Sequence, residues 1–125
     1  MLDHVSIGVR DIARSRHFYD AVLATLGYRC LLEGDHYAGY GHGNPEFWVN
    51  TSPAPVPADD RSGLHFSFVA SSPAAVDAFH AAALAAGGLD NGKPGLRPDY
   101  GPTYYAAFAK DPDGYRIEAH CEAAA

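Results

Sequence analysis

Three side chains with metal-binding chemistry stand on the polar sides of strand-like segments. His4 and His65 each belong to a segment in which apolar and polar residues alternate, and Glu118 belongs to a third such segment near the C-terminus. Two histidines and one carboxylate are a common metal triad that leaves positions open for water or substrate. Two surface histidines left by a gene duplication would give the same pattern, so the residues alone leave both interpretations open.

The two halves of the chain are related by a shift of 61 residues, which is the separation of His4 and His65. The same shift matches four further pairs: Ser6 with Ser67, Phe18 with Phe79, Leu23 with Leu84, and Gly27 with Gly88. Each half indicates a strand, a helix and several more strands. We therefore expect an α+β fold of two βαβββ modules, residues 1–52 and 63–122 of a single domain 1–125, whose curved mixed sheets surround a metal-binding groove.

Boundary signals define the expected elements. Asp11 is a suitable N-cap for a helix that ends at Gly27, and Ser72 caps a second helix that ends at Gly87. The expected strands are residues 3–9, 28–33, 36–40, 46–50, 64–70, 103–109 and 115–121. Residues 51–63 contain three prolines and predict a stiff linker, while residues 89–102, rich in Gly, Pro, Asp and Asn, predict a long loop.

Composition restricts the classes of partner. The 125 residues are 47% hydrophobic and 19% charged, which is typical of one folded domain. The net charge of −6 and the absence of a basic run argue against nucleic acid and anionic membranes as partners. We expect neither a membrane span nor a signal peptide. Cys30 and Cys121 are far apart in the sequence and form no CxxC motif. Both belong to strand-like segments, where a free cysteine usually packs as a small apolar residue, so we expect a reduced, cytoplasmic protein.

Both ends of the chain resemble the vicinal oxygen chelate superfamily, which includes glyoxalase I, fosfomycin and bleomycin resistance proteins, and extradiol dioxygenases. The opening carries His-Val-Ser-Ile-Gly-Val at residues 4–9, then Asp11 and the helical Arg-His-Phe-Tyr at residues 16–19. The ending carries Asp-Pro-Asp-Gly at residues 111–114 shortly before Glu118, and it is the more specific signal. The resemblance extends over essentially the whole chain.

This resemblance implies a site and a reaction class. His4, His65 and Glu118 would bind a divalent ion (Zn, Ni, Fe, Mn or Co), with Glu118 and Tyr105 as catalytic candidates. The implied protein is a glyoxalase-like, metal-dependent lyase or isomerase that acts on a small oxygenated metabolite through a metal-chelated enolate or alkoxide. The alternatives are a non-enzymatic ligand-binding protein of the bleomycin-resistance type and an extradiol-type dioxygenase. Paired subunits often close the site in relatives of this size, so we expect a homodimer in which His4 of one chain meets His65 and Glu118 of the other.

The sequence departs from glyoxalase I at the fourth ligand, a carboxylate that the resemblance places on the last strand of the first module. Alignment with that strand puts Trp48 at the ligand position. Glu46 lies two residues away on the same strand face, and a register shifted by two residues would make it the ligand instead. Trp48 would make the site flatter and more apolar. Arg97, Tyr100 and Tyr104 lie in or beside the predicted long loop, and we expect these four side chains, Trp48 included, to bind substrate. Tyr104 and Tyr105 should point to opposite faces of their strand.

Overall fold

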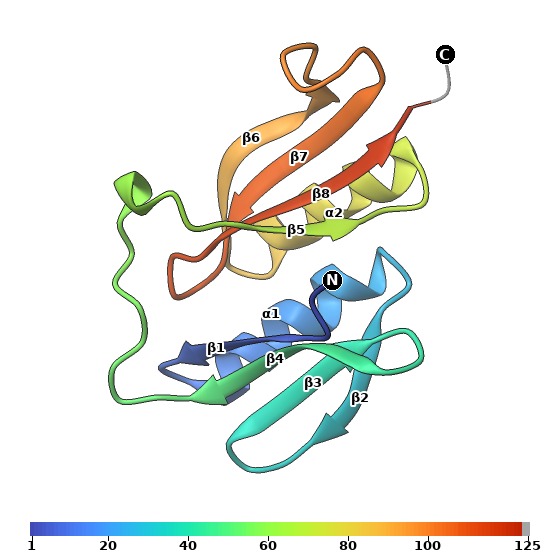
Figure 1. Ribbon diagram of the computed structural model, residues 1–125. Helices are drawn as coiled ribbons and strands as arrows, with labels where there is room; N and C mark the ends of the chain where they lie inside the picture. The colour runs from blue at the N-terminus through green and yellow to red at the C-terminus, as the bar shows by residue number, and fades with distance from the viewer. Residues whose placement is uncertain (124–125) are drawn as a thin grey trace.

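The computed structural model describes residues 1–123 and contains two four-stranded sheets, each accompanied by one helix (Figure 1). The first module consists of β1 (Val5–Val9), α1 (Ile12–Ala24), β2 (Arg29–Glu33), β3 (Tyr37–Gly41) and β4 (Pro45–Thr51). The second consists of β5 (Phe66–Val69), α2 (Pro73–Ala85), β6 (Leu89–Leu96), β7 (Tyr104–Lys110) and β8 (Arg116–Glu122). The linker carries a short 3-10 helix, η1 (Asp60–Ser62).

The strand orders, β1-β4-β3-β2 and β5-β8-β7-β6, are the same in the two modules. In each sheet the first and last strands of the module pair in parallel, β1 with β4 and β5 with β8, and all other pairs are antiparallel. These mixed, open sheets confirm the predicted α+β class and the repeated βαβββ unit.

Local sequence signals explain where each of the two helices begins and ends. The Asp11 side chain accepts a hydrogen bond from the Arg14 backbone at 3.1 Å, and the Ser72 hydroxyl accepts one from the Ala75 backbone at 3.1 Å. After each helix the chain turns at a glycine with positive φ, Gly27 at 83° and Gly87 at 99°. No helix within residues 1–123 is both long and apolar enough to cross a membrane.

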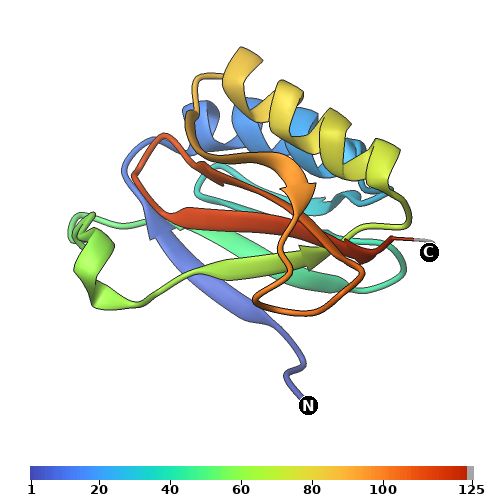
Figure 2. The ribbon, with the colours of Figure 1, turned by 90° about the horizontal axis from the view of Figure 1, so that it is seen from above.

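The apolar core lies between the helices and the sheets, and it continues from one module into the other. Both helices lie on the same side of the two sheets (Figure 2). The ring of Phe47 on β4 lies 5.1 Å from that of Phe68 on β5 and 6.0 Å from that of Phe66. Since the apolar sheet faces meet this core, the polar faces of both sheets point away from it.

The Asp-Pro-Asp-Gly turn before β8 connects the modules through buried carboxylates. Asp111 accepts hydrogen bonds from the Tyr19 hydroxyl of α1 at 2.5 Å and from the Tyr115 backbone at 2.9 Å. Asp113 accepts them from the Arg10 backbone and the Arg14 guanidinium at 3.1 and 3.3 Å. Burial raises the pKa of Asp111 to about 6. This turn therefore fixes the start of β8 relative to the first module.

The prediction of a long loop over residues 89–102 was wrong, because residues 89–96 form strand β6 at the edge of the second sheet. Its pairing with β7 shifts register on both sides of Gly92, which leaves Pro94 outside the regular ladder. An edge strand with bulges tolerates proline and glycine because their positions need not supply ladder hydrogen bonds. The connection to β7 is correspondingly shorter, residues 97–103.

Candidate functional site

A buried carboxylate lies at the centre of the polar face of the second sheet. Glu118 on β8 is 2% exposed, and its register neighbours are Ser67 on β5 and Phe108 on β7. One carboxylate oxygen lies 3.1 Å from Nε2 of His65, and the other accepts a 2.5 Å hydrogen bond from the Tyr104 hydroxyl. The structure thus brings together two predicted metal ligands and one predicted substrate-binding residue.

The electrostatics of this cluster keep Tyr104 protonated. Burial and the adjacent Glu118 carboxylate raise the pKa of Tyr104 to about 12, so its hydroxyl remains a donor at neutral pH. The His65 side chain is 47% exposed, in contrast to Glu118. The imidazole is therefore accessible to a ligand, whereas the carboxylate forms the floor of the site.

Tyr105 does not lie in this cluster. Its hydroxyl donates a 2.7 Å hydrogen bond to Asp77 on α2, on the helix side of the sheet. Successive residues of a strand point to opposite faces, so only one of the two adjacent tyrosines can reach Glu118, and that residue is Tyr104. The expected catalytic role of Tyr105 does not fit this placement.

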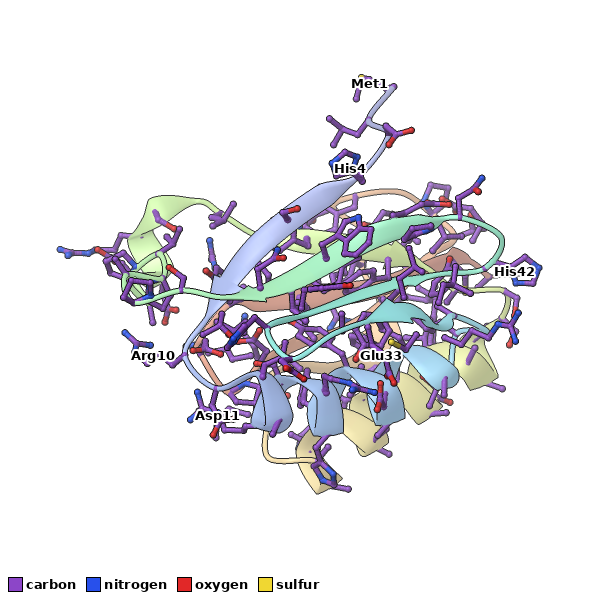
Figure 3. All side chains as sticks on the ribbon, turned by 90° about the horizontal axis from the view of Figure 1, so that it is seen from below. Met1, His4, Arg10, Asp11, Glu33 and His42 are labelled. Atoms are coloured by element: carbon purple, nitrogen blue, oxygen red, sulfur yellow. The ribbon has the colours of Figure 1, made fainter. Side chains whose placement is uncertain are left out.

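The first sheet carries a second group of candidate ligands on its polar face. Figure 3 shows His4 where β1 begins, at the opposite end of the strand from Arg10 and Asp11. Its Nδ1 lies 2.7 Å from an Asp3 carboxylate oxygen. The parallel register of Val5 with Phe47 places His4 beside Glu46 on β4. Both residues line a cavity of about 720 Å³.

Trp48 lines the same cavity and occupies the space above Gly39. A Cβ atom at Gly39 would lie 2.7 Å from the indole ring, and the ring of Tyr37 is 6.1 Å from it. Because an indole has no free lone pair to donate to a metal, Trp48 supplies a flat apolar wall. The exposed Glu46, in contrast, carries a carboxylate, which is a side-chain type that can bind a metal ion.

The expected triad does not assemble within one chain. In residues 1–123, no three His, Cys, Asp or Glu side chains are close enough together to hold a metal ion. His4 and His65 both line a cavity of about 350 Å³ between β1 and β5, but each contacts its own carboxylate partner. Imidazole and carboxylate groups are present on both polar faces, and these donor types suit Zn, Ni, Fe, Mn or Co.

Arg97 and Tyr100 lie on the second sheet's side of the molecule, in the same cavity as Glu118. They share a cavity of about 860 Å³ with His65, Tyr104 and Glu118. The sequence prediction gave no role to Arg116 or Phe108, which line it too. Strand alternation could have found both, because Arg116 precedes Glu118 by two residues and Phe108 follows Tyr104 by four.

Comparison with known proteins identifies the family. A model of the Glyoxalase/Bleomycin resistance protein/Dioxygenase superfamily matches residues 1–119. The chain belongs to this superfamily. Among curated proteins, none matches this chain. Members of the superfamily typically bind divalent metal ions and small molecules, and they often form dimers.

Solved structures of superfamily members support the assignment. A glyoxalase/bleomycin resistance protein from Albidiferax ferrireducens is 36% identical, with a TM-score of 0.84 over 96% of this chain and 98% of that one. A superfamily domain from Frankia sp. is 22% identical, with a TM-score of 0.71 over 98% and 97%. The fosfomycin resistance protein FosX from Mesorhizobium loti is 18% identical, with a TM-score of 0.69 over 96% and 90%. The last two similarities show the fold alone.

Proposed function

We propose that the protein is a metal-dependent enzyme of the glyoxalase-like, lyase or isomerase type that acts on a small oxygenated metabolite. The observation that carries this proposal is the contact of a buried Glu118 carboxylate with His65 and Tyr104 on an otherwise accessible sheet face. Burying a carboxylate costs free energy unless partners stabilise it, so a buried carboxylate beside an open imidazole favours a functional site over a neutral surface.

The ligand set is completed by a second chain. His65 and Glu118 would hold the ion together with His4 of the partner subunit, because no triad assembles within residues 1–123 of one chain. Both half-sites lie on polar faces that point away from the shared core, where another copy can reach them. A two-fold homodimer would join each His4 face to a Glu118 face and form two equivalent sites.

The protein side chains have distinct tasks at this site. A divalent ion bound there would supply Lewis-acid stabilisation of negative charge on two neighbouring substrate oxygens. We assign Glu118 the task of accepting a proton from the substrate at its Oε1 atom, which lies 3.1 Å from Nε2 of His65. Tyr104 holds the other oxygen and thereby orients the carboxylate, so it is a positioning residue. Trp48 forms an apolar wall that excludes water.

A second candidate function is ligand binding without catalysis, as in the bleomycin-resistance branch. The exposed Tyr100 ring and the half-buried Trp48 ring offer flat surfaces for an aromatic ligand. An extradiol-type dioxygenase that uses Fe would share the His4, His65 and Glu118 ligands. The free thiols of Cys30 and Cys121 accord with a cytoplasmic location, which we propose for each candidate.

Metal analysis of the purified protein tests the proposal. We expect one divalent ion per chain after reconstitution of the wild type, strong loss of binding in His65→Ala, and unchanged binding in His42→Ala, which alters an exposed turn histidine far from His4 (Figure 3). Loaded protein would then be assayed with hemithioacetals, with epoxides plus thiols, and with catechols. A wild type that binds no divalent ion at micromolar concentration would contradict the enzyme and favour the ligand-binding function.

A further inference from the structure

Two arginines border the Glu118 site in a protein whose net charge is −6. Arg97 follows β6 and Arg116 lies on β8, and both line the cavity of about 860 Å³ that contains Glu118. Within residues 1–123 their hydrogen bonds go to backbone carbonyl oxygens, of Lys93 at 2.6 Å and of Leu64 at 3.1 Å, and not to carboxylates. Each guanidinium group therefore keeps N–H donors for another partner.

The structure holds Arg97 in a defined position. Its guanidinium carbon lies 5.3 Å from the ring centroid of Phe108, the register neighbour of Glu118. Cβ atoms at Gly92 and Gly95 would each lie 3.3 Å from the guanidinium nitrogens, so the glycines leave room for it. Stacking on an aromatic ring pre-organises a guanidinium group, which reduces the entropy lost when it binds a ligand.

Arg116 approaches the same cavity along β8. It precedes Glu118 by two residues on the same strand face, and its Nε donates to the Leu64 carbonyl just before His65. The exposed Asp99 also lines the cavity and offsets part of the positive charge. Glu118 already accepts a hydrogen bond from Tyr104, and the two guanidinium groups remain without a carboxylate partner among the described residues.

We propose that the substrate is an organic oxyanion, a carboxylate or a phosphonate, whose charged group binds Arg97 while its reacting oxygens face His65 and Glu118. Guanidinium groups bind planar or tetrahedral oxyanions through paired N–H donors, which lysine cannot reproduce. Arg116 adds positive potential from the other strand. The part of this inference that concerns the reacting oxygens depends on the proposed function. The oxyanion subsite is argued from Arg97 and Arg116 alone and does not depend on it.

Binding to the metal-free protein tests the subsite separately from the metal. The purified metal-free protein, in its own oligomeric state, is titrated with three compounds: benzoate, phenylphosphonate and the neutral benzamide. NMR chemical shifts or calorimetry give the affinity of each compound. We expect at least one of the two acids to bind about tenfold or more tightly than benzamide, since charge-assisted hydrogen bonds exceed neutral ones by this order. The acid that binds more tightly identifies the oxyanion.

Variants separate a specific subsite from general charge attraction. Arg97→Gln should abolish the preference for the acid over benzamide, and Arg97→Lys should retain only part of it. Arg29→Gln removes the same charge from an exposed position on β2 and should leave the preference intact. Circular dichroism confirms that each variant folds.

Two kinds of result overturn the oxyanion subsite. One is a wild type that binds neither acid at millimolar concentration or binds acid and amide equally. The other is a folded Arg97→Gln variant that keeps the preference. Zn²⁺ titration of the same variants distinguishes this failure from failure of the proposed function. If the wild type prefers the acid but binds no Zn²⁺, the result supports the oxyanion subsite and contradicts the proposed metalloenzyme. Arg97→Gln should bind Zn²⁺ with the same affinity as the wild type.

Discussion

The hydrogen bond from Tyr104 to Glu118 provides a quantitative test of the site. Tyr104→Phe removes the donor to a carboxylate that is 2% exposed. Hydrogen bonds to charged groups contribute roughly 1.5–3 kcal/mol, so we expect the free energy of unfolding of the metal-free protein to fall by about 2 kcal/mol at pH 7. Chemical denaturation measures this change.

The adjacent tyrosine supplies a matched control. Tyr105→Phe removes a hydrogen bond of similar length, but its partner Asp77 is exposed on α2. Solvent screening limits the loss to less than about 1 kcal/mol. Metal affinity separates the variants further: it should fall about 10- to 100-fold in Tyr104→Phe, because Glu118 loses its orienting partner, and stay unchanged in Tyr105→Phe. Equal effects of the two variants on stability and on metal affinity would refute the assignment of Tyr104.

Two further predictions concern the framework. Burial raises the pKa of Asp111 to about 6, so the folded state holds its proton more tightly than the unfolded chain, and this group makes the free energy of unfolding fall as pH rises from about 4 to 6. Asn cannot titrate, so the free energy of unfolding of Asp111→Asn minus that of the wild type should rise by up to roughly 3 kcal/mol between about pH 4 and pH 6, as measured by denaturation. If this difference stayed the same at all pH values, the burial argument would be contradicted. Gly39→Ala should displace the indole of Trp48, the sole tryptophan, change its fluorescence and cost about 1–3 kcal/mol. Gly43→Ala, where a Cβ meets no atom within 4 Å, is the control that should change neither quantity.

The sequence allowed the repeated unit to be predicted because its signals are local. Alternation placed Ile117 and Ala119 in the core and Glu118 on the opposite face, and Asp11 and Ser72 mark the helix starts. These features depend on residues within a few positions of each other, so the pattern in one chain suffices.

Features that depend on pairing between distant segments could not be predicted. Strand β6 contains Gly92 and Pro94, whose local preference is for a loop, and its pairing with β7 overrides that preference. Which of the two adjacent tyrosines contacts Glu118 could not be predicted either. It depends on the register of β7 with β8, which determines whether Tyr104 or Tyr105 lies on the same sheet face as Glu118. Spacing likewise left open whether His4 and His65 meet in one chain, because that depends on how the modules pack.

Metal binding by a mixed dimer tests the shared site most directly. His4→Ala and His65→Ala chains are co-expressed, and each variant alone should bind no metal. If the site combines His4 of one chain with His65 and Glu118 of the other, half of the randomly formed dimers carry one intact site, and the mixture should bind about a quarter of the wild-type metal per chain. If the mixture binds no more metal than either variant alone, while the wild type binds one ion per chain, the site lies within a single chain and the account is wrong.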